Sequence, residues 1–170
     1  MLNYVRSLLK KSQHSAFNLW LLNRVFRFSI PFNSAHKLRI SKVEPELIET
    51  VAPNKRRNKN HINGMHACCI ATISEFAAGV SFLNRLDPSK YRFILSDLNI
   101  HYSYQGKTAC RAVAKLSNQD LEEKIMKPLS ESDAVLYEQT SEVFDGNDQL
   151  IATCKTTWQI KDWSKVKTKL

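Results

Sequence analysis

One segment of this sequence constrains the fold more than any other, namely residues 66–84, HACCIATISEFAAGVSFLN. Its apolar side chains recur at the i, i+3 and i+4 spacing of one helix face. They are Cys69, Ile73, Phe76, Ala77, Val80 and Leu83. The opposite side carries the small residues Ala71, Ala78 and Gly79 and one acid, Glu75. Because a helix that is apolar nearly all round is a buried helix, we expect Glu75 to be withdrawn from bulk water.

Strand patterns surround this helix. Residues 35–53 predict two strands, and the alternation of apolar and polar residues after Asp87-Pro88 predicts four more. The later strands cover 94–104, 108–116, 136–144 and 150–160, with a hairpin turn at 105–107, a turn at 145–148, and a loop or short helix over 118–131. One apolar helix among six antiparallel strands packs most economically when the sheet wraps around it, so the sequence predicts an α+β fold.

The N-terminal region is helical in pattern. Residues 2–29 predict one or two helices, which Pro31 ends. No linker rich in Gly, Ser or Pro divides the chain. We therefore predict a basic amphipathic extension over residues 1–31 and a single domain over residues 32–165.

The charge of the chain is strongly basic and uneven. The 25 Lys and Arg residues outnumber the 16 Asp and Glu residues, which gives a net charge of +9, and the first acid is Glu44. Basic surfaces attract phosphates of any kind, whether nucleic acid, anionic lipid or a phosphopantetheine carrier. No aromatic-interleaved motif accompanies the charge, which argues against nucleic acid as a partner.

The cysteines predict free thiols. Cys68 and Cys69 are adjacent and poorly suited to a disulfide framework, while Cys110 and Cys154 fall in predicted strands. Free buried thiols fit a reducing cytoplasm. The apolar stretch at residues 17–28 is interrupted by polar residues, so we expect neither a membrane span nor a signal peptide.

No metal site or cofactor is predicted. His61, His66, Cys68 and Cys69 lie close together, but their spacing does not match the paired-ligand loops of zinc sites.

Residues 60–79, NHINGMHACCIATISEFAAG, resemble the active-site segment of the PaaI-like hotdog-fold thioesterases. The pattern there is His-Gly-Gly, then six intervening residues, then Glu or Asp, so that the acid stands nine residues after the His. In this chain His66-Ala67-Cys68 stands at the His-Gly-Gly position and Glu75 at the acid position. The stretch SDLNIHYSYQGKTACRAVA is similar to a later strand-turn-strand of the family, and the resemblance covers about residues 34–160, as an uncharacterised branch.

The resemblance implies a hotdog fold, in which a six-stranded antiparallel sheet wraps around one long helix. It implies a homodimer, or a tetramer built from it, that hydrolyses an acyl-coenzyme A or acyl-carrier-protein thioester in fatty acid and lipid metabolism. In such relatives the acid works on a substrate held across the dimer interface and faces the turn of the other subunit.

Thioester hydrolysis needs a carboxylate and amide donors for the oxyanion. We assign Glu75 as general base or nucleophile, and His66 and Asn60 as residues that position the carbonyl. The backbone amides of Ala67 and Cys68 at the helix start are the candidate oxyanion donors. The further substrate-binding candidates are Met65 and Gly79, together with Lys55, Arg56, Arg57 and Lys59 for phosphates at the tunnel mouth.

Several alternatives stay open at this level. Both glycines of the family pattern are replaced, by Ala67 and Cys68, which favours a non-catalytic hotdog dimer that binds acyl groups or a partner protein. Glu75 is alternatively a structural carboxylate that is satisfied by backbone groups, or by Asn60 or Asn63 at the interface between subunits. His66 is alternatively a helix cap.

The extension has two alternative roles. It either packs on the sheet or closes the acyl tunnel as a lid, or it lies on an anionic membrane, which would make the cytoplasmic protein membrane-peripheral.

Overall fold

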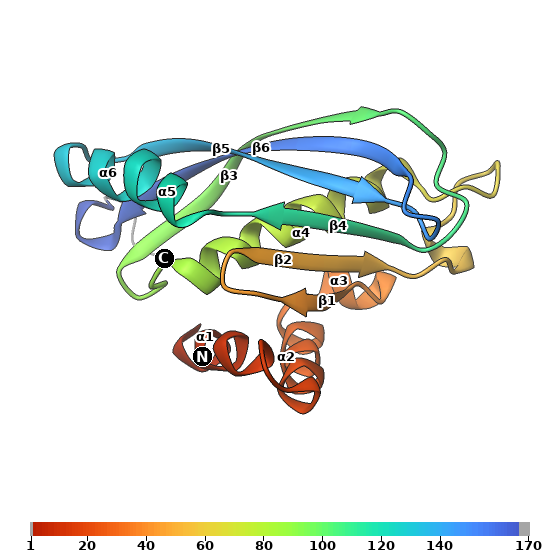
Figure 1. Ribbon diagram of the computed structural model, residues 1–170, viewed down its shortest axis with the longest axis horizontal. Helices are drawn as coiled ribbons and strands as arrows, with labels where there is room; N and C mark the ends of the chain where they lie inside the picture. The colour runs from red at the N-terminus through yellow and green to blue at the C-terminus, as the bar shows by residue number, and fades with distance from the viewer. Residues whose placement is uncertain (1, 167–170) are drawn as a thin grey trace.

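A six-stranded antiparallel sheet wraps around one long helix, α4 (Ala67–Arg85), in the computed structural model, which describes residues 2–166 (Figure 1). The strands are β1 (Arg39–Val43), β2 (Leu47–Ala52), β3 (Tyr91–Tyr102), β4 (Cys110–Lys115), β5 (Val135–Phe144) and β6 (Leu150–Asp162). Their order across the sheet is β1-β2-β4-β5-β6-β3. This confirms the predicted α+β hotdog fold.

The predicted hairpin at residues 105–107 is wrong. β3 pairs with β6, whereas β4 pairs with β2 and β5, so the chain crosses the end of the sheet between β3 and β4. Tight hairpin turns favour a residue with positive φ, and none of the glycines has one. Gly106 is instead needed for a close approach, because a Cβ there would lie 2.8 Å from the Cys110 Sγ.

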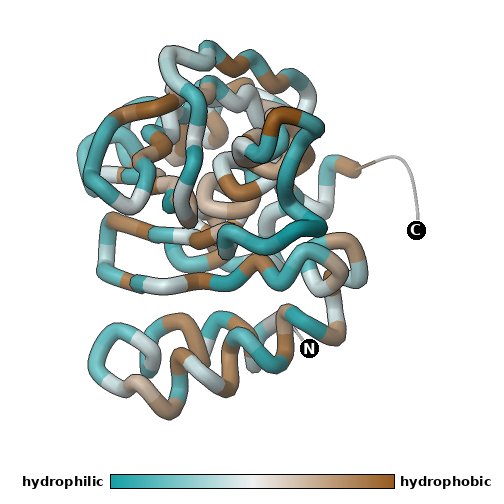
Figure 2. Tube along the Cα trace, turned by 90° about the vertical axis from the view of Figure 1, so that its right-hand side faces the viewer, coloured by the Kyte–Doolittle hydropathy of each residue, from teal (hydrophilic) through white to brown (hydrophobic). Residues whose placement is uncertain are grey.

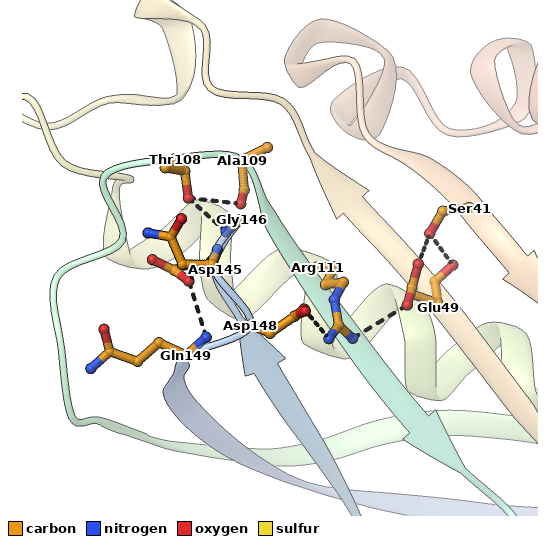
Figure 3. Close-up of polar contacts among 10 residues, drawn as sticks. Ser41, Glu49, Thr108, Ala109, Arg111, Asp145, Gly146, Asp148 and Gln149 are labelled. Atoms are coloured by element: carbon orange, nitrogen blue, oxygen red, sulfur yellow. Dashed lines mark hydrogen bonds and ion pairs between the residues drawn. The ribbon is translucent and has the colours of Figure 1, made fainter.

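The hairpin between β5 and β6 is present as predicted. The Asp145 side chain accepts the backbone N–H of Asn147 and that of Gln149, and these bonds shape the turn. Figure 3 shows the bond to Gln149. Next to it, Arg111 of β4 is paired with Asp148 at 2.8 Å and with Glu49 of β2 at 3.4 Å (Figure 3). These contacts join the turn to the middle of the sheet.

Helix α4 lies against the inner face of the sheet and supplies the centre of the core. Its buried residues are Cys69, Ile70, Ile73, Ser74, Phe76, Ala77, Ala78, Val80, Ser81, Phe82 and Asn84. Among the described helices, only α4 has the length and composition that a membrane span requires, and most of it is buried inside this fold. Its apolar character is therefore that of a core helix.

The N-terminal region forms three helices, α1 (Leu2–Ser12), α2 (Ala16–Ser29) and α3 (Pro31–His36). Pro31 does not end the helical region. It begins α3, where a proline at the first helical position loses no hydrogen bond. Figures 1 and 2 place α1 and α2 beside the β1 edge of the sheet.

These helices share the core of the rest of the chain. Val5, Leu8, Leu9, Leu22 and Phe26 are buried and belong to the same apolar cluster as the residues of α4. The N-terminal segment is therefore packed on the sheet and on α4 rather than forming a free arm.

The remaining elements are short. The loop before α4 contains the turn η1 (Arg56–Asn58). Between β4 and β5 lie α5 (Asn118–Asp120), the π-helical turn η2 (Leu121–Met126) and α6 (Lys127–Glu131), and η3 (Trp163–Lys165) follows β6. The prediction of a loop or short helix over 118–131 is confirmed in its helical form.

Candidate functional site

The Glu75 side chain lies half-buried on α4, on the side of the helix that faces a cleft of about 640 Å³. That volume is within the range of small-molecule binding sites. The lining is mostly apolar and consists of Phe26, Ile30, Phe32, Asn33, Cys68, Ala71, Thr72, Glu75, Phe76, Gly79, Val80, Leu83, Phe93, Leu98 and Trp158. The prediction that Ala71 and Gly79 flank Glu75 on the small-residue side is confirmed, whereas Ala78 is fully buried and lies outside the cleft.

The Glu75 carboxylate has neither a hydrogen bond nor an ion pair with any residue in the range 2–166. Within one chain, Asn60 and Asn63 make no bond to Glu75, and the alternative in which they bond it at a dimer interface stays a prediction. Burial raises the pKa of the Glu75 carboxyl above its ordinary value, because the charged form loses hydration. The close approach at Gly79 is to Trp158, because a Cβ there would lie 3.2 Å from the Trp158 Cη2, whereas its distance of 3.8 Å from the Glu75 Oε1 is an ordinary contact.

Two buried hydroxyls hold the middle of α4 at the level of Glu75. Thr50 of β2 donates to the Ile73 carbonyl at 2.7 Å, and Ser141 of β5 donates to the Ser74 carbonyl at 3.3 Å. The two accepting carbonyls belong to Ile73 and Ser74, the two residues that immediately precede Glu75 in the chain. These two strands therefore fix the height and rotation of α4 at the point where Glu75 leaves it.

His66 is the N-cap of α4. Its Nδ1 accepts the Cys68 backbone N–H at 3.1 Å, which satisfies one of the free amides at the helix start. The structure therefore shows His66 as a helix cap, and its role in positioning the thioester carbonyl stays a prediction. The Cys68 amide is consequently engaged, while the Ala67 amide has no acceptor among the described residues.

Asn60 shapes the loop before α4. Its side-chain oxygen accepts the backbone N–H groups of Ile62 and Gly64 at 3.1 and 3.0 Å. Asn60, Met65 and Ala67 line a separate cleft of about 310 Å³ that has no residue in common with the Glu75 cleft. Within one chain, the structure therefore does not bring these three candidates together with Glu75.

A smaller cleft of about 190 Å³ continues the Glu75 cleft toward the loop that contains Arg57. The two clefts share Phe32, Cys68 and Thr72, so a path runs from Glu75 past the start of α4 to Arg57. Arg57 also donates to the Ala35 carbonyl at 3.0 Å. Of the four predicted phosphate-binding residues only Arg57 lines this path, because Lys55, Arg56 and Lys59 lie outside both clefts.

Comparison with known proteins identifies the family. The profile of a family described as a domain of unknown function, DUF4442, matches residues 19–160. The chain belongs to this family. A search of curated protein sequences finds no match. The family match begins within α2 and ends within β6.

Solved structures share the fold of this DUF4442 protein. One is a protein of unknown function from Pseudomonas aeruginosa, described as a probable thioesterase, with 21% identity, a TM-score of 0.77 and coverage of 84% of this chain and 95% of that one. Another is a thioesterase from Haemophilus influenzae, with 14% identity, a TM-score of 0.67 and coverage of 89% and 95%. A protein of unknown function from Chlorobaculum tepidum has 11% identity, a TM-score of 0.72 and coverage of 89% and 98%.

The sequence did not reveal one wall of the cleft in this DUF4442 protein. That wall comes from the end of α2 and from α3 and consists of Phe26, Ile30, Phe32 and Asn33. Helical periodicity shows that Phe26 faces a core, but no local pattern indicates which core. Trp158 of β6 also lines the cleft, and its buried Nε1 has no hydrogen-bond partner among the described residues.

The cysteine and metal predictions can be compared with the structure directly. All four cysteines are free, and Cys69, Cys110 and Cys154 are buried as expected. Cys68 is exposed, contrary to the expectation of a buried thiol, because it sits on the cleft side of the first helical turn. Among residues 2–166 no group of three His, Cys, Asp or Glu side chains is placed to hold a metal ion.

Proposed function

We propose that this protein hydrolyses the thioester between an acyl group and coenzyme A or acyl carrier protein, with Glu75 as the general base. The observation that carries the proposal is a single carboxylate, without a partner among residues 2–166, in a mostly apolar cleft that suits an acyl chain. A carboxylate without structural bonds has its oxygens available for reacting groups. The fold shared with solved thioesterases supports the same class of reaction.

The proposed reaction proceeds through water. The Glu75 carboxylate removes a proton from a water molecule, and the resulting hydroxide adds to the thioester carbonyl carbon. The tetrahedral oxyanion then collapses, the carbon–sulfur bond breaks, and the departing thiolate takes the proton from Glu75. The products are the carboxylic acid and the thiol.

The oxyanion donors would come from the start of α4. The Ala67 amide is the one free N–H of this turn among the candidates, and the positive end of the α4 dipole favours developing negative charge there. Ala67 and Glu75 line different clefts of one chain. We therefore propose that Glu75 of one protomer faces the α4 start of its partner in a homodimer, as the resemblance to the hotdog thioesterases implies.

Arg57 is the proposed contact for the carrier. It lines the end of the path that leads from Glu75, and its guanidinium suits the phosphates of coenzyme A or phosphopantetheine. Because Arg57 already donates to the Ala35 carbonyl, its side chain is held in place before a ligand arrives.

A second candidate function is acyl binding without turnover. The observation that favours it is the bond from the Cys68 amide to His66, which takes one of the two candidate oxyanion donors. Removal of one such donor typically costs about 10²–10³ in rate. In this alternative the cleft would hold an acyl group while hydrolysis stayed slow.

One experiment separates the two functions. Thiol release is measured for acyl-coenzyme A substrates from acetyl to palmitoyl, and for the matching acyl carrier proteins, with binding of each followed by calorimetry. We expect hydrolysis that falls about 10²–10⁴-fold in Glu75→Gln and is unchanged in Glu122→Gln, an exposed carboxylate outside the cleft. Tight binding with no Glu75-dependent hydrolysis of any substrate would establish the second function instead.

A further inference from the structure

Helix α2 exposes a stripe of aromatic side chains. Phe17, Trp20 and Phe28 are 69%, 56% and 78% exposed, and their positions in the chain place them on one side of the helix. Large aromatic groups exposed together on one face mark an interaction site more often than single exposed residues do. We call Phe17, Trp20, Arg24 and Phe28 the α2 stripe.

The other side of α2 is fixed to the protein. Leu22 and Phe26 are buried, and the Asn23 side chain bonds both the N–H and the C=O of Ile40 on the edge strand β1, each at 2.8 Å. The helix therefore cannot rotate to bury the α2 stripe against its own domain. The stripe is a permanent surface of the folded chain.

One arginine side chain, that of Arg24, accompanies the aromatic rings. The Arg24 guanidinium carbon lies 5.8 Å from the centre of the Trp20 ring and 5.9 Å from that of Phe28, and the Phe17 and Trp20 rings are stacked with centroids 5.8 Å apart. An Arg held over aromatic rings keeps its charge at the level of the apolar surface. This combination suits the boundary between lipid headgroups and acyl chains.

The charge around the stripe has one sign. Residues 1–43 hold eight of the 25 Lys and Arg residues and none of the 16 Asp and Glu residues. Six of these cations are exposed and make no ion pair with any described residue: Lys10, Lys11, Arg24, Arg27, Lys37 and Arg39. A second copy of the chain on this face would bring like charges together, whereas an anionic surface complements them.

The surface is continuous with the cleft. The same helix that carries the α2 stripe contributes Phe26 to the cleft wall, and the following helix contributes Phe32, which is 61% exposed. Nucleic acid fits this arrangement less well, because the aromatic groups stand on an outward helix face and no basic groove accompanies them.

From these observations we propose that the α2 stripe and its surrounding cations form a docking surface for an anionic phospholipid membrane. The aromatic side chains enter the interface and the cations contact the headgroups, with the cleft wall next to the lipid. The inference concerns a binding surface and stands apart from the proposed hydrolytic activity.

The test is co-sedimentation of the full chain with vesicles of phosphatidylglycerol and phosphatidylcholine, and with vesicles of phosphatidylcholine alone. We expect binding to the anionic vesicles that weakens steeply with salt, since the Debye length falls from about 10 Å at 0.1 M to about 3 Å at 1 M. Phe17→Ser/Trp20→Ser/Phe28→Ser and Arg24→Glu/Arg27→Glu should each lower the partition coefficient at least about 10-fold.

The control variants make comparable changes at exposed positions outside the α2 stripe. Leu136→Ser/Leu150→Ser removes exposed apolar groups from β5 and β6, and Lys107→Glu/Lys115→Glu reverses two exposed charges. These should bind like the wild type, and all four variants should keep its melting temperature. Three outcomes would overturn the proposal. The first is an equal loss of vesicle binding in the stripe and control variants, and the second is no binding to anionic vesicles. The third is binding of an oligonucleotide or of a second copy, in place of vesicles, that depends on the stripe.

Discussion

At the scale of single residues, Glu75 shows how far local sequence goes. Its small, uncharged neighbours Ala71 and Gly79 predicted a desolvated acid, and the structure agrees. The hydrogen-bond partners of the backbone amides at the start of α4 could not be predicted in the same way. Whether an amide is free depends on the side-chain rotamer of His66, which places Nδ1 against the Cys68 N–H.

The raised pKa of Glu75 has a consequence for stability. The folded state favours the protonated acid, so the contribution of Glu75 to the free energy of unfolding is full below the ordinary carboxyl pKa of about 4.3 and is lost as pH rises through the raised pKa. Gln resembles the protonated form of Glu. Glu75→Gln should therefore have a higher melting temperature than the wild type at about pH 8 and the same melting temperature at about pH 4. Each kcal/mol corresponds to about 2–4 °C for a chain of this size. Thermal melts across this range check it, and a lower melting temperature for Glu75→Gln at pH 8 would contradict it.

The two hydroxyls that hold α4 are positioning residues that no sequence pattern indicated. Thr50→Val removes the 2.7 Å bond to the Ile73 carbonyl and should cost about 0.5–1.5 kcal/mol of stability. If that bond also sets the position of Glu75, kcat should fall while KM changes little.

Thr156→Val is the matched control for this prediction. Thr156 is also fully buried, but its hydroxyl donates to the Gln139 carbonyl on the neighbouring strand and not to α4. Thr156→Val should lower the free energy of unfolding by an amount similar to that of Thr50→Val and leave kcat unchanged. A parallel loss of kcat in both variants would show that Thr50 acts on stability alone.

At the scale of elements, all six strands and the helices α1, α2 and α4 could be predicted, but helix α3 and the pairing of β3 could not. Alternation in residues 94–104 and 108–116 shows that both segments are strands. It does not show that β3 leaves its neighbour in sequence to pair with β6, because that choice depends on contacts distant in the chain. Amphipathic periodicity likewise predicted α1 and α2 but not that they complete the cleft wall.

The attachment of α2 to the sheet edge can be tested through Asn23. Its side chain covers the edge of β1 by bonding both backbone groups of Ile40. Asn23→Leu keeps the size of the side chain and should lower the free energy of unfolding by about 1–3 kcal/mol. Asn18→Leu serves as the control, since the side chain of Asn18 makes no hydrogen bond within residues 2–166. Urea denaturation that shows no difference between the two variants would contradict this role.

At the scale of the whole molecule, the exposed edge of the sheet predicts association. β3 is the edge strand opposite β1, and it leaves Ile94 and Tyr102 exposed at 49% and 40%. A long open edge is usually covered or paired. Pairing of two β3 strands would extend the sheet across both protomers.

We therefore expect a homodimer in solution. Light scattering at micromolar concentration should give about twice the chain mass of 19.6 kDa. Ile94→Lys should shift the equilibrium toward monomer by placing two like charges near the joined edges. A wild-type mass of one chain at every concentration would count against the shared site that we propose for Glu75 and the start of α4.

The central claim is that Glu75 acts as the base of a thioester hydrolase. The measurement that tests it most directly is kcat/KM for thiol release from one long-chain acyl-coenzyme A as a function of pH, in the wild type and in Glu75→Gln. The account predicts that wild-type activity rises with pH as Glu75 ionises, with a midpoint above the ordinary carboxyl value of about 4.3, and that Glu75→Gln is about 10²–10⁴-fold slower without this rise. A Glu75→Gln enzyme that keeps the wild-type rate and pH profile would contradict it.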